Sequence, residues 1–431
     1  MLMKPLMSLK SDKLHGKWLV FMLLVLAICC AQASYVHAET NPGEGSKSSH
    51  AASVHELLGS GDLQFHGFVS QGFIYTSRND VFGTSQDWGS FGLTEIGLNL
   101  LLKPTSRLQF SAQELFRRAG EGSSGDPRID FAFVDYRLLS RVASQFGIRA
   151  GRIKNPFGFY NETRDVPFTR PSILLPQSIY FDRTRNVALS ADSLQIYGEQ
   201  IITGMGSISA QFGVGQPIVN DKDTEVSLLG MLRPGHLSPD MTLLGRLIYE
   251  TEDQAFRTAL SGIWMNINYD RAAVDTLASG SIDFNPLYLS VQYNAERWSL
   301  TSEYALRRFR YMGFSDPFLD SLDFSGESIY LQGEYRLNAK WQAMARYDLL
   351  YTDRNDRSGK RFSGRFAVPD YSRFAKDATV GISWNLTPEF MLRGEYHFIN
   401  GTAWLSPLDN PVSASTRQYW SLYALQVSYR F

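Results

Sequence analysis

Residues 423–431 read YALQVSYRF, and this final stretch predicts the fold of the chain. Its apolar residues (Tyr423, Leu425, Val427, Tyr429, Phe431) alternate with Ala424, Gln426, Ser428 and Arg430. Because successive side chains of a strand point to opposite faces, the stretch predicts a β-strand with one apolar face. In a soluble protein it would be an aggregation-prone edge. In a closed membrane barrel, the apolar face meets lipid and no edge remains. An ordinary amphipathic edge strand is the alternative.

The ending also resembles the C-terminal signature of bacterial outer-membrane β-barrels, a final aromatic residue with another aromatic two positions earlier. The resemblance implies that Tyr429 and Phe431 form an assembly signal read by the barrel assembly machinery. It also implies a Gram-negative outer membrane as the location and its lipid as a partner.

The N-terminus predicts export. Lysines at 4, 10, 13 and 17 precede an apolar run over residues 18–31, which is shorter than the roughly 20 residues of a membrane-spanning helix. Small residues follow, so we predict a signal peptide over 1–38 cleaved after Ala38, with Ala33 as the alternative. Lipidation at Cys29 is disfavoured because Ile28, which precedes it, is bulky.

Charge and cysteine content exclude several functions. Both cysteines, Cys29 and Cys30, lie in the leader, so the mature chain would have no disulfide or thiolate metal site. The leader carries four Lys and one Asp, and its removal changes the net charge from −1 to −1 − 3 = −4, which argues against nucleic acid as a partner. A mean hydropathy of −0.20 suits a barrel with a polar lumen better than a helical membrane protein.

The remaining chain predicts a polar, flexible periplasmic segment over 39–62 and a transmembrane antiparallel β-barrel over 63–431. The clearest alternating strands are 243–250, 298–307, 329–337, 341–351 and 390–398. Their charged faces predict these pore-wall residues, together with Arg149 of strand 143–154: Arg246, Glu303, Arg307, Glu334, Arg336, Arg346, Asp348, Arg393, Glu395 and His397.

Connections alternate between tight turns, such as 103–105 and 338–340, and longer polar segments: 77–90, 119–127, 270–280, 312–323, 353–374 and 401–415. Short periplasmic turns alternating with long outer loops are typical of outer-membrane barrels. Counting strands literally gives about 17, but an even number is required, so we predict 16 strands, with 18 as the alternative. The odd strand count arises in 206–270, where each connection can be an inner or an outer one.

One connection, 155–192, is much longer than the others. Structureless loops of this length are usually functional or disordered. This one holds large apolar residues that disordered segments lack, so we expect it to fold against the inner barrel wall.

Residues 151–158, GRIKNPFG, which run into the start of this insert, resemble the G-[RK]-x-K-x-P-F-G motif of the phosphate-selective porin O/P family. Residues 169–172, TRPS, followed by Pro176, are similar to a second stretch of that family. The resemblance implies a trimeric general-diffusion or substrate-selective porin whose third loop folds into the lumen and constricts the pore. The insert departs from the family in lacking lysine, which leaves phosphate specificity open.

The insert's charges are balanced, with four arginines against four acids. We predict a pore constriction formed by Arg164, Asp165, Arg170, Asp182, Arg183 and Arg185. Arginine binds carboxylate or phosphate through its fork, and rings of charged side chains select ions in channels. In the alternative interpretation these arginines only pair with neighbouring acids and hold the loop in place.

Motifs for enzymatic chemistry are missing: no Gly-rich phosphate loop, H-E-x-x-H or G-x-S-x-G occurs. We therefore expect no enzyme and no cofactor or metal. The sequence predicts a homotrimeric porin for passive diffusion of small hydrophilic solutes, anions included. A non-transport barrel with an adhesion, structural or assembly role and a loop-plugged lumen is the alternative.

Overall fold

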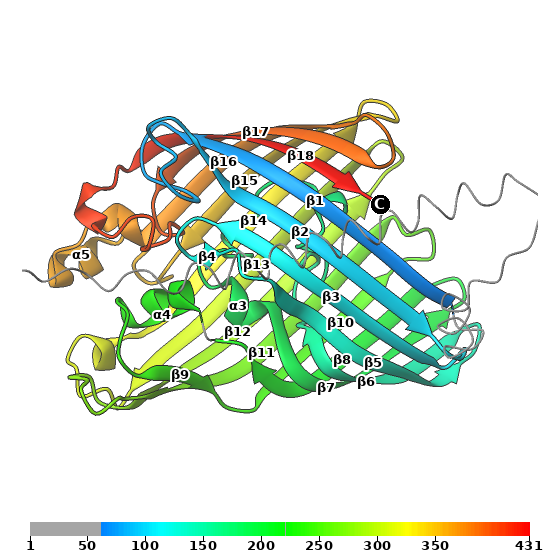
Figure 1. The fold of residues 1–431 in the computed structure, drawn as a ribbon, viewed down its shortest axis with the longest axis horizontal. Helices are drawn as coiled ribbons and strands as arrows, with labels where there is room; N and C mark the ends of the chain where they lie inside the picture. Colours follow the sequence, from blue (N-terminus) through cyan, green and yellow to red (C-terminus); the bar gives the residue numbers. More distant parts are fainter. Residues whose placement is uncertain (1–61, 220) are drawn as a thin grey trace, which may run out of the picture. The chain divides into compact units, whose positions relative to one another are not determined.

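The computed structural model describes residues 62–219 and 221–431, which form one closed antiparallel β-barrel (Figure 1). The predicted signal peptide and the predicted segment up to residue 61 lie outside the described residues; β1 begins at Asp62. The strands are β1 (Asp62–Thr76), β2 (Ser90–Lys103), β3 (Leu108–Ala119), β4 (Ser123–Ser124), β5 (Arg128–Ser140), β6 (Ser144–Lys154), β7 (Ser190–Ile202), β8 (Gly206–Pro217), β9 (His236–Pro239), β10 (Thr242–Glu250), β11 (Phe256–Asp270), β12 (Gly280–Asn294), β13 (Trp298–Met312), β14 (Asp323–Arg336), β15 (Trp341–Tyr351), β16 (Phe374–Asn385), β17 (Phe390–Gly401) and β18 (Tyr419–Arg430).

Helical segments are short and lie in the connections. They are η1 (Pro167–Thr169), α3 (Arg185–Leu189), α4 (Lys222–Leu229), η2 (Leu319–Ser321), α5 (Lys360–Phe366), η3 (Asp370–Arg373) and η4 (Ser413–Ser415). Among the described residues, no helix is both long and apolar enough to cross a bilayer.

Sixteen strands build the wall, as predicted. Of the 18 strands in the sheet, β4 has 2 residues and β9 has 4, so 18 − 2 = 16 strands make the barrel. In the region of uncertain parity, 206–270, one long connection over 218–241 carries both α4 and β9, while 251–255 is a tight turn at the other end. The literal count of 17 was therefore wrong.

The last strand closes the barrel as the sequence predicted. β18 pairs antiparallel with β17 on one side and with β1 on the other. Gly67 and Phe431 exchange two backbone hydrogen bonds, each 3.0 Å long, at the end of this seam.

Long and short connections lie at opposite ends of the barrel (Figure 1). The end with α4, α5 and β9 carries the long connections, and we call it the long-loop end. The other end carries tight turns such as 104–107, 295–297, 337–340 and 386–389, and we call it the short-turn end.

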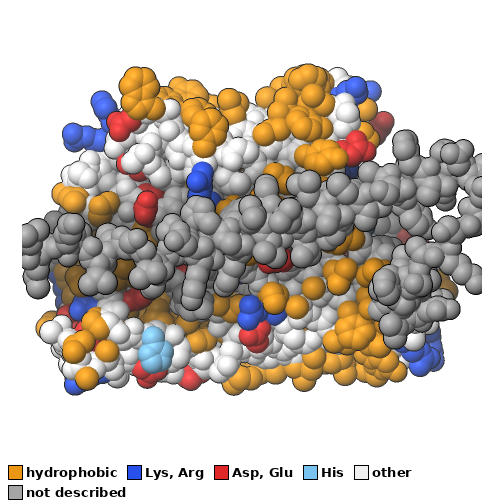
Figure 2. All heavy atoms as spheres, viewed as in Figure 1, with side chains coloured by type: hydrophobic (Ala, Val, Ile, Leu, Met, Phe, Trp, Pro, Cys, Tyr) orange, Lys and Arg blue, Asp and Glu red, His pale blue; other side chains and the backbone are white. Residues whose placement is uncertain are grey.

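Side chains alternate between the two faces of the wall. On β17, Arg393, Glu395 and His397 are buried inside the barrel, while Phe398 is 49% exposed on the outer surface. Apolar side chains are widespread on the outer face seen in Figure 2. The other strongly alternating strands show the same division between a buried inner face and an exposed outer face.

The polar lumen expected from the hydropathy does not extend over the whole inner face. On β11 and β12 the inward face is largely apolar and contributes to a buried cluster with residues of the long third loop. Ile263, Ile267 and Ile282, for example, are at most 1% exposed on this inner face. The physical reason is that the loop and α4 cover this part of the wall, so these side chains pack against protein rather than water.

Candidate functional site

The third long connection, residues 155–189, folds into the barrel; we call it the L3 loop. Its two ends are tied together by Asn161, whose Nδ2 donates to the carbonyl oxygens of Asn155 (2.9 Å) and Leu189 (3.2 Å). Gly158, near the start of the loop, has a left-handed φ of 57°, and a Cβ there would meet Tyr180 Oη and Glu303 Oε1. Glycine therefore lets the backbone approach the wall closely.

On the side of β13, Glu303 anchors the loop. Its carboxylate accepts from the Tyr180 hydroxyl (2.7 Å) and from the Phe159 backbone N–H (2.9 Å). Four residues further along the same face of the strand, Arg307 donates to the carbonyl of Ser178 (2.7 Å). These wall charges bind loop backbone and side chain instead of pointing into open water.

On the side of β15 and β17, the loop is held by further predicted wall residues. Arg393 donates to the carbonyls of Pro167 (2.8 Å) and Arg170 (2.6 Å), and Arg346 donates to that of Leu174 (3.0 Å). Glu395 accepts from the backbone N–H of Leu174 at 3.3 Å. The loop is thus bonded to well-separated parts of the wall.

Two ionic clusters complete the attachment near β2, β3 and β6. Glu95 accepts from Arg170 (2.7 Å) and from Arg117 (3.3 Å), and Arg117 reaches Asp182 (2.8 Å). In the second cluster Lys154 pairs with Asp130 (2.5 Å) and Asp165, which also pairs with Arg185.

The six predicted constriction residues all lie in the L3 loop, but their surroundings differ. Arg164, Asp165, Arg170 and Arg185 are at most 6% exposed, and Asp182 lies among them, bonded to Arg117. Burial lowers the pKa of Arg164 to about 10. These contacts correspond to the alternative interpretation, in which charges hold the loop in place.

Arg183 is the member of the six that behaves differently. Among the described residues, no carboxylate lies within 4 Å of its guanidinium, and its buried Nε has no hydrogen-bond partner. It lines two cavities at the long-loop end.

The remaining predicted wall residues are also accounted for. Arg246 donates to Gly158 (3.0 Å) and pairs with Glu162 of the loop, and Asp348 accepts from the Ser178 N–H at 3.3 Å. Arg149 points inward and pairs with Asp135 at 2.9 Å.

Glu334 and Arg336 lie towards the short-turn end. Glu334 accepts from Gln332 (2.9 Å) and Gln342 (2.6 Å). Arg336 is exposed and donates to the carbonyl oxygens of Ala295 and Glu296 in a tight turn, so it caps that turn rather than lining the lumen.

His397 is buried in a network that shares Glu395 with the L3 loop. Its Nδ1 lies 2.9 Å from Asp377 and 3.0 Å from the Thr379 hydroxyl, and its Nε2 lies 3.3 Å from Glu395. The Ser383 hydroxyl on the neighbouring strand accepts from Arg393 at 3.2 Å.

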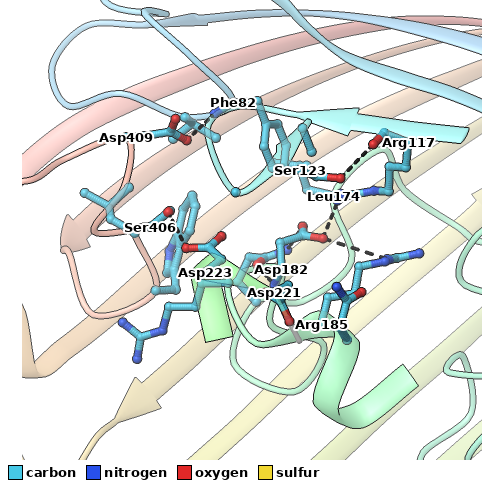
Figure 3. A pocket seen from close by; sticks show the side chains of 18 of the residues that line it. Phe82, Arg117, Ser123, Leu174, Asp182, Arg185, Asp221, Asp223, Ser406 and Asp409 are labelled. Atoms are coloured by element: carbon cyan, nitrogen blue, oxygen red, sulfur yellow. Dashed lines mark hydrogen bonds and ion pairs between the residues drawn. The ribbon is translucent and has the colours of Figure 1, made fainter. Parts of the chain in front are cut away.

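A small polar pocket of about 40 Å³ lies at the long-loop end (Figure 3). There the Ser406 hydroxyl of the last long connection donates to Asp223 of α4 at 2.6 Å. Burial raises the pKa of Asp223 to about 7, with a smaller contribution from the charge of Asp221. Asp409 accepts from the backbone N–H of Phe82 at 3.1 Å, so the same pocket joins three long connections.

Larger cavities lie on either side of the L3 loop. One of about 860 Å³ opens among the tight turns at the short-turn end and reaches Arg170 and Arg393. Another of about 330 Å³ lies at the long-loop end and is lined by Arg164, Arg183 and Arg307. The two cavities share no lining residue.

Sequence reasoning missed several residues of this site. Glu95 and Arg117 sit on strands whose alternation is weaker, although their inward parity could have been read from it. Arg373 lies in a connection that was interpreted only as a polar loop. Phe284, Phe309 and Phe324 line the inner wall, where polar residues were expected.

This geometry defines the chain as a porin-like barrel: a closed 16-stranded wall with a long third loop inside. No protein-family profile and no curated protein sequence matches the chain.

Solved structures do match. An anion-selective porin from Comamonas acidovorans is 13% identical with a TM-score of 0.55, covering 86% of this chain and 100% of that one. In-vitro folded OmpT of Vibrio cholerae, an outer membrane protein in a trimer form, is 11% identical with a TM-score of 0.53 over 86% and 100% of the two chains. OmpF of Salmonella typhi, in complex with daunomycin, is 13% identical with a TM-score of 0.50 over 86% and 97%. At these identities the likeness establishes the fold.

Proposed function

We propose that the protein is an outer-membrane porin that lets small hydrophilic solutes, anions among them, diffuse passively through a lumen constricted by the L3 loop. The observation that carries this proposal is the loop itself. It is fixed inside a 16-stranded barrel by bonds to opposed wall residues such as Glu303 and Arg393, with a cavity on either side. A fixed loop between two vestibules is the arrangement of a selective constriction. The similarity to an anion-selective porin supports the same function.

The test is electrical. Protein purified in detergent and added to a planar bilayer should give discrete ohmic current steps, and the reversal potential in a salt gradient should show whether anions are preferred. Denatured protein at the same detergent concentration is the control. Absence of steps from folded protein would overturn the porin proposal.

A second function is favoured by a specific observation. The cavities on the two sides of the L3 loop share no lining residue, and the loop is bonded to several strands. A barrel plugged in this way would serve adhesion, structure or assembly without conducting. If intact protein is silent but a variant lacking residues 159–187 conducts, the loop is a plug and this second function holds.

We also propose that the chain is exported by its signal peptide, inserted by the barrel assembly machinery and surrounded by outer-membrane lipid as a homotrimer. The trimer form of the structurally similar OmpT supports the oligomeric state. Light scattering coupled to gel filtration in mild detergent should give three times the mass of the mature chain; a monomeric mass would contradict it.

A further inference from the structure

The cavity at the long-loop end combines an aromatic wall with four arginines. Seven phenylalanines line it, and three of them, Phe284, Phe309 and Phe324, are directly opposite one another on β12, β13 and β14. Their rings stack with centroid distances of 4.6 Å and 5.3 Å. A flat apolar surface of this kind favours a ring or an alkyl chain over a hydrated ion.

Cations surround this aromatic surface. Arg164, Arg183, Arg307 and Arg373 line the cavity, and none of the described lining residues is an Asp or Glu. A lining with four cations and no acid attracts anions, although Asp182 lies 3.7 Å from Arg164 just outside it.

Arg183 and Arg373 have spare binding capacity. Within residues 62–219 and 221–431, neither guanidinium donates a hydrogen bond or has a carboxylate within 4 Å; Arg373 lies over the Phe362 ring at 3.8 Å. Burial, together with the charge of Arg183, lowers the pKa of Arg373 to about 10. The two cations therefore repel each other. Buried charge of one sign without a partner is costly, and an anionic ligand would relieve that cost.

Arg307 adds a fixed donor between the two features. It is held by the Ser178 carbonyl (2.7 Å) and the Ser328 hydroxyl (2.7 Å), and its neighbour two positions along, Phe309, belongs to the ring stack. An anion held by the arginines would therefore have its apolar part against the phenylalanines.

We propose that this cavity binds an amphipathic organic anion, a carboxylate joined to a ring-sized apolar body. The carboxylate binds Arg183 and Arg373, and the body stacks on Phe309 and its two neighbours. The cavity volume of about 330 Å³ is at the small end of ligand pockets and suits one such molecule. The inference goes beyond the proposed porin function by naming a ligand class, and it holds whether or not the barrel conducts.

Calorimetric titration of the folded protein in micelles tests the proposal, with empty micelles subtracted. The probes are 2-naphthoate, its neutral analogue 2-naphthamide, and two anions without an apolar body, acetate and inorganic phosphate. We expect 2-naphthoate to bind at least tenfold more tightly than the other three. Equal binding of naphthoate and naphthamide, or tighter binding of phosphate, would overturn the proposal.

Variants assign the binding to this cavity. Arg183→Gln and Arg373→Gln should each weaken naphthoate binding about tenfold, and Phe309→Ala should weaken naphthoate and naphthamide alike. Arg308→Gln is the control, because Arg308 lies beside Arg307 and Phe309 on β13 but has its side chain on the opposite face, 47% exposed. If Arg308→Gln matters as much as Arg183→Gln, or if neither arginine in the cavity matters, the assignment fails. Binding is measured without current, so a silent barrel that binds naphthoate would overturn the porin function alone.

Discussion

Arg170 of the L3 loop donates from Nη2 to Oε2 of Glu95 on β2 at 2.7 Å, although the two residues are 75 positions apart. Both side chains are almost fully buried, with 6% and 1% of their surfaces exposed. The pair fixes the middle of the loop to the wall, next to the second contact of Glu95 with Arg117.

Replacing Arg170 should release the loop. The variant Arg170→Gln leaves Glu95 with one cationic partner, and breaking a buried ion pair from one side costs about 3–5 kcal/mol. We expect faster trypsin cleavage within 155–189 and, in bilayers, larger and noisier current steps. Arg152→Gln is the control, since Arg152 pairs with Asp192 where both are partly exposed, at 29% and 60%. Identical cleavage rates for Arg170→Gln and the intact protein would show that the pair does not hold the loop.

The contact between α4 and the last long connection should weaken as the pH rises. The carboxyl of Asp223, which accepts from Ser406, has its pKa raised from 3.8 to about 7, chiefly by burial. Its stabilising contribution is therefore complete below about pH 4, is lost between about pH 4 and 7, and stays lost above that. Arg183, Asp221 and Asp409 are the other charged groups near it.

Hydrogen exchange measures this loss. Protection factors for residues 402–410, corrected for the intrinsic exchange rate, should fall from pH 4 to 7 and then level off. In Asp223→Asn the side chain stays neutral, so its protection should vary little with pH. A rise in protection across this range in the unmodified protein would contradict the raised pKa.

Glu303 should be sensitive to loss of its charge. Four donors converge on its carboxylate: Ser290 Oγ (2.6 Å), Tyr180 Oη (2.7 Å), Tyr330 Oη (2.8 Å) and Phe159 N–H (2.9 Å). Glu303→Gln turns an amide NH₂ towards these donors, and each buried donor left without an acceptor costs about 1–3 kcal/mol. Thermal unfolding in micelles, followed by circular dichroism, should occur at a lower temperature.

The control for this change is Glu250→Gln on β10. Glu250 is 31% exposed and lies 3.8 Å from Arg257, so the same substitution should be nearly neutral there. Equal destabilisation of the two variants would mean that the convergent hydrogen bonds of Glu303 contribute little.

The local alternation of the sequence predicts which residues of the barrel wall point inward, but it does not predict the contacts of the L3 loop. Glu303 and Arg307 could be assigned to the inner face because a strand repeats every two residues, and any inward charge then follows from its parity. The pairing of Arg170 with Glu95 has no counterpart in the local sequence pattern, because it depends on the path of a long loop inside the barrel.

The ligand cavity was hidden for a related reason. β11 and β12 carry apolar residues on both faces, as at Trp264 outside and Ile263 inside, so their pattern cannot say which face meets lipid. Arg373 lies in a connection rich in charge, where a single arginine that turns inward looks like any solvated one. Only the packing of the L3 loop and α4 against the wall shows which face of β11 and β12 is the inner one.

The seam between β1 and β18 should depend on the absence of a side chain at position 67. Gly67 exchanges two backbone hydrogen bonds with Phe431, and a Cβ at Gly67 would overlap the Phe431 ring. Gly67→Val forces that ring aside, away from Phe65 and Tyr429, whose centroids lie 6.3 Å and 6.2 Å from it. Forcing extra volume into a packed site costs about 1–3 kcal/mol.

We expect the folded, fast-migrating band of Gly67→Val on a gel to convert to the unfolded band at a lower temperature than that of the intact protein. Gly333→Ala is the control, because the nearest atom to a Cβ there is 4.0 Å away.

The variant Phe431→Ala separates the role of this residue in closing the barrel from its proposed role in recognition by the assembly machinery. It removes the ring but keeps the backbone bonds, so the protein should still refold in detergent, whereas its yield in the outer membrane should drop if the assembly machinery reads Phe431. A normal membrane yield of Phe431→Ala would remove the proposed assembly signal and leave Phe431 only its part in closing the barrel.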